Sequence, residues 1–333
     1  MSDKTIVAVD ALGGDFAPSV VLDGVKAALG QDPGLTVVLC GPKEVVEPFA
    51  ASHERCIAKV TTEFIDMGEH PANAVRSKKD SSIVVGCRLV KEGEAGGFFS
   101  AGSTGACLAA ATLVMGRIKG VARPALCTVV PSPAAPVILC DVGANADCKP
   151  EYLLQFAQMA TVYARDVVGL PDPKVGLLNI GTEETKGSQF AQECHSLLAE
   201  RLPNFHGNVE GKDVLAATCE VVVTDGFTGN VCLKTIEGAS SVLFGAVKSA
   251  ILEGGPLAKI GGAAIKGSLK RLKGQVSADT YGGAPLLGVK GVCIVGHGSS
   301  SPEAIKNGIL FTAKAIREDL TGMIAASVAS KRQ

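Results

Sequence analysis

Ile6-Val7-Ala8-Val9-Asp10-Ala11-Leu12-Gly13-Gly14-Asp15 is the stretch that decides the fold, because an unbroken apolar run stops at an acidic residue and glycines follow at once. The same pattern recurs around Ser100, Asp141, Gly181 and Asp225. Unbroken apolar strands are typical of a parallel sheet that helices cover on both faces. Such sheets bind ligands at the carboxyl ends of their strands, so the sequence predicts one polar, glycine-lined site built from several loops.

Strand-like and helical segments alternate along the whole chain, which predicts the α/β class with a mostly parallel sheet. We expect strands near residues 5–9, 36–40, 59–65, 97–100, 125–130, 136–140, 174–180, 220–224 and 291–295. We expect helices near residues 18–29, 80–92, 103–115, 149–168, 187–201, 228–252 and 302–320. The length of 333 residues suits one α/β unit over residues 1–333, with room for a division into two lobes.

Composition narrows the class of partner and the compartment. The net charge is −1 and no long basic stripe is present, so we expect no nucleic-acid partner. The eleven cysteines form no Cys-x-x-Cys pair, which predicts no metal site and thiols that act as small buried groups in a reducing cytoplasm. The uncharged stretches 98–116 and 124–140 are broken by loop residues or prolines and are expected in the core rather than in a membrane.

The loop Ser100-Ala101-Gly102-Ser103-Thr104-Gly105 precedes a helix of small residues. Its backbone N–H groups, two hydroxyls and the helix dipole favour an anion, for which phosphate is the natural candidate. An ordinary serine cap with glycines for close packing explains the same residues. Nucleotide-binding glycine motifs, a zinc-protease motif and a serine-hydrolase elbow are missing from the sequence.

Two further polar segments could serve a site. His297 and Ser299 lie in Gly296-His297-Gly298-Ser299-Ser300-Ser301, between an apparent strand and a helix, where His297 could contact substrate, donate a proton or be structural. Residues 76–82 combine cations and hydroxyls, which suits either an anionic substrate or a charged surface turn.

Residues 254–273 form a protruding basic amphipathic segment in our interpretation. Ile265 and Leu269 share a helical stripe, and Lys266 and Lys270 lie on the adjacent one. Such a segment can lie on an anionic membrane surface. A solvated helical hairpin whose apolar face packs on the protein or on a partner subunit is the alternative.

Several long motifs, in the same order along nearly the whole chain, resemble the PlsX family of phosphate acyltransferases of bacterial phospholipid synthesis. They are residues 9–15, 79–82, 100–106, 141–152, 179–187, 224–231, 281–285 and 297–300. The resemblance implies a three-layer α/β/α sandwich related to phosphotransacetylase and isocitrate dehydrogenase. It also implies a homodimer, a peripheral membrane location, and transfer of an acyl group from acyl-(acyl carrier protein) to inorganic phosphate without metal, nucleotide or other cofactor. The acyl-phosphate would pass to a glycerol-3-phosphate acyltransferase.

Positions that match the family motifs suggest two catalytic residues. Lys186 would neutralise phosphate or the oxyanion, and Asn230 would donate a hydrogen bond through its amide. Our candidates for the phosphate cradle are Ser100, Gly102, Ser103, Thr104 and Asn145, with His297 and Ser299 as further candidates. Candidate membrane contacts are Ile260, Ile265, Lys266, Leu269 and Lys270.

Two positions depart from the family pattern. Leu12 stands where methionine is usual, and Ser103 where asparagine is common, which puts a direct contact by that side chain in doubt. Acidic residues that faced phosphate would repel it, so Asp10, Asp15, Asp141 and Asp225 are expected to orient loops and cations. Competing interpretations are a phosphotransacetylase that uses acetyl-coenzyme A, a non-catalytic membrane scaffold or lipid-binding protein, and a dehydrogenase on a similar fold.

Overall fold

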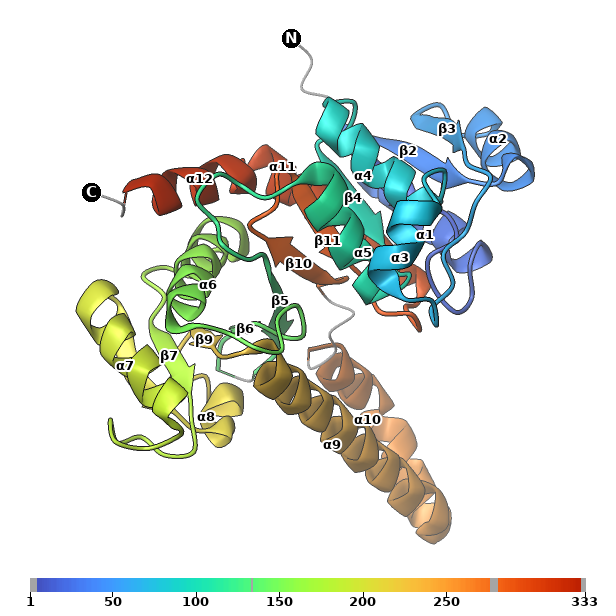
Figure 1. Cartoon of the computed structure of the whole chain (residues 1–333). Coiled ribbons are helices and arrows are strands. Elements are labelled where there is room, and N and C mark those ends of the chain that lie inside the picture. The colour runs from blue at the N-terminus through green and yellow to red at the C-terminus, as the bar shows by residue number, and fades with distance from the viewer. Residues whose placement is uncertain (1–4, 133, 276–280, 331–333) are drawn as a thin grey trace.

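One eleven-stranded sheet runs through the computed structural model, with helices packed on both of its faces (Figure 1). The structure describes residues 5–132, 134–275 and 281–330, and gives no side-chain environment for residues 270–275 and 330. The strand order is β3-β2-β1-β4-β11-β10-β5-β6-β9-β7-β8. The strands are β1 (Thr5–Asp10), β2 (Leu35–Gly41), β3 (Cys56–Val60), β4 (Gly97–Ser100), β5 (Ala125–Val130), β6 (Val137–Cys140), β7 (Val175–Leu178), β8 (Phe205–Val209), β9 (Val221–Val223), β10 (Ala284–Leu287) and β11 (Val292–Val295).

Strand direction divides the sheet into two parallel halves. β3, β2, β1, β4 and β11 run one way, and β6, β9, β7 and β8 run together. Between the halves, β10 is antiparallel to both β11 and β5, and β5 is antiparallel to β6. The halves therefore point in opposite directions. The mostly parallel sheet is confirmed, but the expectation of a single carboxyl edge for all the glycine loops is wrong.

Helices form the two outer layers. One face carries α1 (Ser19–Gln31), α2 (Lys43–Ala51), α6 (Pro150–Val162) with η2 (Tyr163–Val168), α7 (Gln189–Arg201), α11 (Pro302–Arg317) and α12 (Leu320–Ser330). The other face carries α3 (Pro71–Ser77), α4 (Ser82–Glu92), α5 (Thr104–Ala110) with η1 (Ala111–Met115), and α8 (Gly211–Ala216). The three-layer α/β/α sandwich is confirmed.

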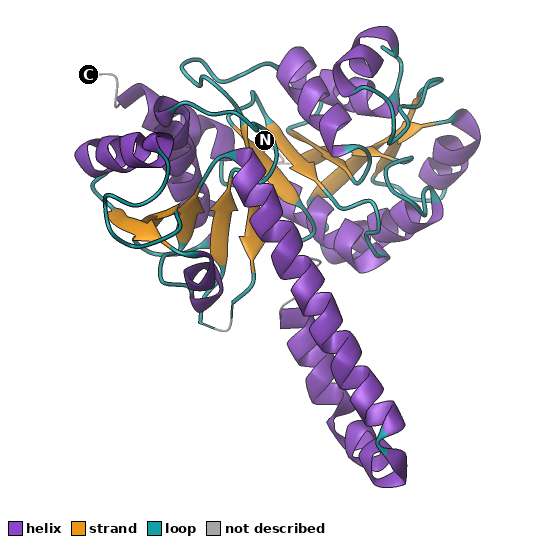
Figure 2. Ribbon diagram, turned by 60° about the horizontal axis from the view of Figure 1, so that its bottom comes forward, coloured by secondary structure: helices purple, strands orange, loops and turns teal. Residues whose placement is uncertain are grey.

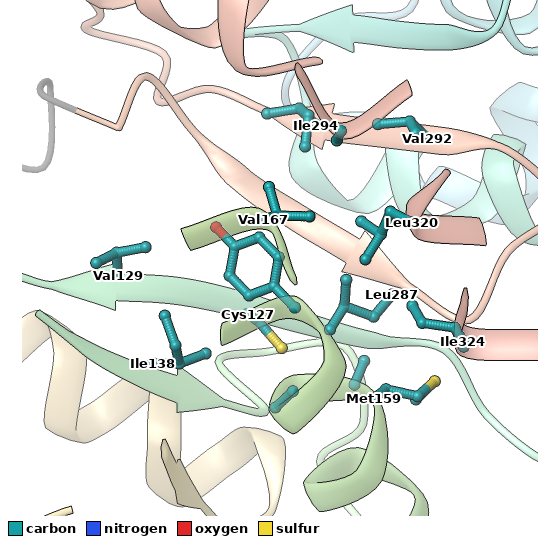
Figure 3. Close-up of a cluster of buried hydrophobic side chains, with 14 of the residues drawn as sticks. Cys127, Val129, Ile138, Met159, Val167, Leu287, Val292, Ile294, Leu320 and Ile324 are labelled. Atoms are coloured by element: carbon teal, nitrogen blue, oxygen red, sulfur yellow. The ribbon is translucent and has the colours of Figure 1, made fainter. Parts of the chain in front are cut away.

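Alternate residues of each strand enter the two apolar layers. In β1, Val7 and Val9 face the cluster under α1 and α11, and Ala8 faces the cluster under α4. Burial on both faces is why the strands read as unbroken apolar runs. Near the centre of the sheet, the core brings strand residues of β5, β10 and β11 against α6, η2 and α12 (Figure 3).

A long helical hairpin leaves this body. It consists of α9 (Gly226–Glu253) and α10 (Gly255–Gln275), which lie side by side and project well beyond the sheet (Figures 1 and 2). In α9 the buried residues are Gly226 and Gly229, both in its first turn. By length and composition alone, α9 is also the one helix of the described chain that could cross a membrane.

The structure differs from the predicted elements in the position of β3 and in elements that were not predicted, namely β8, β10, α2, α3, α8 and α12. β3 occupies Cys56–Val60 rather than residues 59–65, because its pairing with β2 begins at Val37 and Cys56. Residues 284–287 form β10 although Pro285 lacks a backbone donor, and glycines before it resemble a loop in the sequence. Neither short strand has a periodic pattern strong enough to predict it.

Candidate active site

A cavity of about 150 Å³ lies over the sheet where the two halves meet. It has roughly ten times the volume that one water molecule requires. Its wall combines residues of β5, the first residue of β10, the loop after β6, the end of β11, the starts of α5 and α11, and the first turns of α9. The lining includes Thr104, Leu126, Thr128, Val142, Asn230, Leu233, Lys234, Glu237, residues 281–284, Val295, Gly296, His297, Ser300 and Ala304. The cavity extends across one face of the central strands, so loops from both edges of the sheet contribute to its wall.

Asn230 enters the cavity because the start of α9 is tightly fixed. The Asp225 carboxylate accepts hydrogen bonds from the Thr228 backbone N–H at 2.8 Å and from its hydroxyl at 2.7 Å, which caps the helix. A side chain at Gly229 would collide with the carbonyl oxygen of Asp141, so the helix can approach the loop after β6 only with glycine there. The Asn230 amide then donates to the Val142 carbonyl at 3.1 Å. An amide carries two N–H groups, so one is left for a ligand.

Asp141 organises the loop beneath Asn230. Its fully buried carboxylate accepts four hydrogen bonds, from the backbone N–H groups of Leu126, Ala144 and Asn145 and from the Asn145 side-chain amide, at 2.7–3.1 Å. Burial raises the pKa of the Asp141 carboxyl, and these hydrogen bonds oppose that shift. The Asn145 amide also donates to the Pro124 carbonyl at 2.8 Å. Asn145 therefore works inside this network, outside the cavity wall, and its role as a phosphate ligand stays a prediction.

Asp10 likewise organises a loop, at the opposite edge of the sheet. It accepts hydrogen bonds from the Leu12 N–H at 3.0 Å and from the Ser100 hydroxyl at 2.7 Å, and the Ser100 oxygen accepts from the Gly102 N–H at 3.0 Å. Burial raises the pKa of the Asp10 carboxyl. The expectation that acidic residues orient loops is confirmed for Asp10, Asp141 and Asp225. The Ser100 hydroxyl is engaged within the protein, so its place in a phosphate cradle also stays a prediction.

Thr104 is the member of the predicted cradle that the cavity wall includes. Ser103 caps α5 by accepting a hydrogen bond from the Ala106 N–H at 3.3 Å, which is the structural alternative stated for this loop. Gly102 is buried, and a side chain there would meet Ser100 and Asp10. Thr104 is exposed at the first position of the helix, where backbone N–H groups lack helical partners.

His297 also lines the cavity, from the loop after β11. Its ring nitrogen Nδ1 lies 2.8 Å from the Ser299 hydroxyl, which orients the exposed imidazole. Ser299 thus contacts His297 rather than the cavity, and the adjacent Ser300 is part of the wall.

Lys186 is not among the residues that line the cavity. It is an exposed residue of the loop after β7, which is held by a hydrogen bond from the Asn179 amide to the Lys186 carbonyl at 3.1 Å. β7 lies two strands from β6, a separation of roughly 10 Å in the sheet. Lys186 shares an edge with the loops of Asp141 and Asp225, and its catalytic role stays a prediction.

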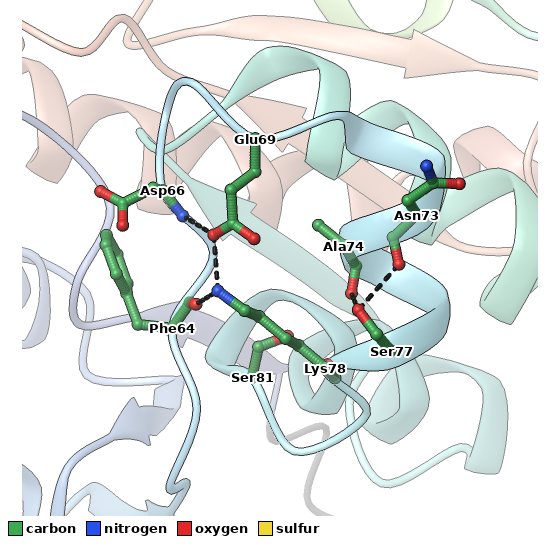
Figure 4. A network of polar contacts seen from close by, with 8 residues as sticks. All are labelled: Phe64, Asp66, Glu69, Asn73, Ala74, Ser77, Lys78 and Ser81. Atoms are coloured by element: carbon green, nitrogen blue, oxygen red, sulfur yellow. Dashed lines mark hydrogen bonds and ion pairs between the residues drawn. The ribbon is translucent and has the colours of Figure 1, made fainter.

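One cation of the turn at residues 76–82, Lys78, is held by contacts within the protein. Lys78 donates to the Glu69 carboxylate at 2.6 Å and to the Phe64 carbonyl at 2.7 Å (Figure 4). Glu69 also accepts from the Asp66 N–H, and the Lys78 contact lowers the pKa of Glu69. These contacts agree with the charged-turn alternative for Lys78.

Several side chains of the cavity wall were not predicted as site residues, among them Thr128, Leu233, Lys234 and Glu237. The last three share one face of α9 with Asn230, at helical positions i, i+3, i+4 and i+7. That spacing is visible in the sequence when Asn230 is taken as a site residue. Thr128 sits within an apolar strand and carries no such signal.

The expectation that the cysteines act as small buried groups is confirmed for most of them. Nine of the eleven are buried, and Cys148 and Cys232 are half-buried. Burial raises the pKa of the Cys148 thiol to about 11. Within residues 5–132, 134–275 and 281–330, the structure contains no group of three His, Cys, Asp or Glu side chains that could hold a metal ion.

The fatty acid synthesis protein family matches residues 5–323 of this chain. A phosphate acyltransferase of Desulfitobacterium hafniense is 50% identical over 307 residues, which cover 91% of each chain. One of Clostridium perfringens is 44% identical over 330 residues, covering 98% of this chain and 97% of the relative. The chain belongs to the PlsX family of phosphate acyltransferases. As a member of this family it is an acyltransferase.

Solved structures extend the likeness to the fold. A phosphotransacetylase from Streptococcus pyogenes has a TM-score of 0.61 and 18% identity, covering 94% of this chain and 95% of that one. A branched-chain phosphotransacylase from Enterococcus faecalis has a TM-score of 0.59 and 15% identity, covering 94% and 99%. The expected relation to the phosphotransacetylase fold is confirmed.

Proposed function

We propose that this protein transfers a fatty acyl group from acyl-(acyl carrier protein) to inorganic phosphate and releases acyl-phosphate for phospholipid synthesis. A phosphate oxygen attacks the thioester carbonyl carbon, the new C–O bond forms, and the C–S bond breaks with the electron pair leaving on sulfur. The family membership supports acyl transfer to phosphate. The observation that carries the assignment to this cavity is that Thr104, Asn230 and His297, from three distant segments, line it together.

In this mechanism the protein positions the reactants and stabilises charge. The second N–H of the Asn230 amide donates to the carbonyl oxygen as it becomes an oxyanion, and its hydrogen bond to Val142 keeps it oriented beforehand. The hydroxyl of Thr104 and the free backbone N–H groups beside it offer donors to phosphate. Lys186 adds positive charge from the neighbouring loop. Asp10 and Asp141 are buried among donors of their own, so they do not repel phosphate at close range.

The experiment measures release of free carrier protein from palmitoyl-(acyl carrier protein), with and without inorganic phosphate, while hydroxylamine traps the acyl product. We expect release that depends strictly on phosphate, together with the hydroxamate. Release without phosphate would indicate a thioesterase. Turnover of acetyl-coenzyme A but not of the carrier thioester would indicate a phosphotransacetylase, and vesicle binding without any turnover would indicate a scaffold.

We further propose that the protein is cytoplasmic, forms a homodimer, binds the membrane surface through the hairpin, and supplies acyl-phosphate to a glycerol-3-phosphate acyltransferase. The hairpin exposes large apolar side chains, among them Val242 (73% exposed), Leu257 (84%) and Ile260 (68%). The exposed Ile265 and Lys266 and the partly buried Leu269 follow on α10, whereas the side chain of Lys270 lies outside the described residues. Because α9 carries Asn230 into the cavity, binding along the membrane surface preserves the site, whereas crossing the bilayer would remove it.

Vesicle flotation tests the membrane proposal. We expect Leu257→Ser with Ile260→Ser to reduce binding to anionic vesicles, since burying each side chain contributes about 1.5–3 kcal/mol. Ile57→Ser is the control, because Ile57 is 52% exposed on the edge strand β3 and lies outside the hairpin. Unchanged flotation of the hairpin variant would refute the membrane contact, and sedimentation of the same proteins measures whether the hairpin joins two subunits.

A further inference from the structure

The wall of the cavity contains a charged pair that has no role in the mechanism proposed above. Lys234 Nζ lies 2.7 Å from Glu237 Oε2, with the two side chains 50% and 38% exposed. Both residues line the cavity, on the same face of α9 as Asn230. Four residues of helix advance about 6 Å, so Lys234 lies one turn beyond Asn230.

Positive charge is scarce at this cavity. Among the described residues that line it, Lys234 is the one lysine or arginine. Lys186 belongs to a loop outside the wall, and Lys78 is paired with Glu69. For a phosphate group in the cavity, the Lys234 ammonium is therefore the fixed positive charge that the wall offers.

Glu237 gives this ammonium a defined position. A lysine side chain has a flexible stem, and an ion pair three residues away on a helix holds it over one surface. The pair is half exposed, so its own strength is small and an anion can compete for the ammonium. Two of the ammonium's three donors remain for a ligand when one is bonded to Glu237.

We propose that Lys234, positioned by Glu237, binds a phosphate group in this cavity, an inference that rests on the proposed function. The phosphate group has two possible sources in that reaction: the inorganic phosphate acceptor, or the phosphodiester that links the thioester arm to the carrier protein. Lys234 contacts the ligand directly, and Glu237 is a positioning residue.

The test compares Lys234→Gln, Lys234→Arg, Glu237→Gln and the control Lys248→Gln, which removes an exposed lysine farther along α9. Direct calorimetry with inorganic phosphate, without any acyl donor, measures binding to each protein. Steady-state assays then give KM for phosphate and for two donors, palmitoyl-(acyl carrier protein) and palmitoyl-N-acetylcysteamine, which lacks a phosphodiester. Melting temperatures check that each variant is folded.

If the ligand is inorganic phosphate, Lys234→Gln weakens phosphate binding and raises its KM about tenfold, the loss of one charged hydrogen bond at a half-exposed site. If it is the phosphodiester, Lys234→Gln raises the KM of the carrier thioester about tenfold and leaves that of the cysteamine thioester unchanged. In either case Lys234→Arg recovers most of the loss. Glu237→Gln lowers the same constant, because the amide oxygen can still accept from Nζ and keep its position while the negative charge that competes with phosphate is gone.

Unchanged constants in folded Lys234→Gln would overturn the proposal, as would equal losses in Lys234→Gln and Glu237→Gln, which would indicate a packing role. Failure of the proposed function can be distinguished from failure of the Lys234 proposal. Wild-type protein that binds phosphate through Lys234 but turns over neither thioester would retain the anion site and lose the acyltransferase assignment.

Discussion

Gly229→Ala gives a direct test of how α9 is fixed against the active site. A methyl group at this position would overlap the carbonyl oxygen of Asp141 and lie 2.9 Å from Thr224 Cγ2. Carbon–carbon contacts are optimal at about 3.5–4.0 Å, so the Thr224 contact alone requires a movement of about 0.6 Å, and the overlap with the Asp141 oxygen requires more. The loop resists this movement because its backbone pairs with β9, through the Asp141 N–H to the Thr224 carbonyl at 3.1 Å.

The cost can be estimated from two opposing effects. Overpacking of a rigid site costs about 1–3 kcal/mol, and the rigid backbone places Gly229 near the upper end. Replacing glycine by alanine within a helix returns about 1 kcal/mol. The net loss is therefore about 2 kcal/mol, which lowers Tm by roughly 3 °C for a chain of this length. Because Asn230 moves with the helix, we expect turnover to fall by about a hundredfold.

Gly245→Ala is the matched control, since nothing lies within 4 Å of a methyl group there. It keeps the helix-propensity gain without the collision, so we expect Tm to rise by roughly 1 °C with turnover unchanged. Calorimetric melting and the phosphate-dependent release assay measure both effects. A Gly229→Ala protein that is as stable and as active as Gly245→Ala would show that the collision with Asp141 does not fix the helix.

Three further predictions concern the site and its surroundings. Asn230→Ala and Lys186→Ala should each lower turnover by about a hundredfold in proteins that retain their melting temperature, and near-normal rates would remove either residue from the site. Ser103→Ala removes the cap of α5 and should lower the free energy of unfolding by about 1 kcal/mol, measured by urea titration; no change would mean that the capping bond contributes nothing. Burial raises the pKa of the Cys148 thiol to about 11, and only the thiolate reacts readily with iodoacetamide. The alkylation rate in native protein should therefore be low at pH 8 and should still increase above pH 9. A plateau by pH 9 would contradict the raised pKa.

Local sequence predicted the elements whose burial is continuous along the chain. Residues 5–10 form a strand buried on both faces, and the apolar spacing of α6 and the serine before α5 marked those helices. The hairpin was foreseen as one of two alternatives for residues 254–273, and the structure describes α10 there as a helix beside α9. β10 was missed because a strand of four residues with proline has too little pattern of its own.

The site was predicted less completely than the fold. Asn230, Thr104 and His297 line the cavity. The polar groups of Ser100 and Asn145 instead form hydrogen bonds with Asp10, Asp141 and neighbouring backbone. A sequence shows that a polar side chain follows a strand, but not which of the nearby donors and acceptors it will pair with. That choice depends on contacts between residues far apart in the chain.

The sequence by itself determined the α/β class, the helices and strands with strong periodicity, the loops that glycine permits, and the family. The family follows from the resemblance of long motifs, and the rest follows from local preferences and from a pattern of burial that repeats every two or 3.6 residues. Only the tertiary structure decided that β10 and β5 reverse the strand direction, that loops of both halves meet at one cavity, and that Lys234 rather than Lys186 lines it. Those features depend on which strands pair and how a helix packs across them, and no local pattern encodes either.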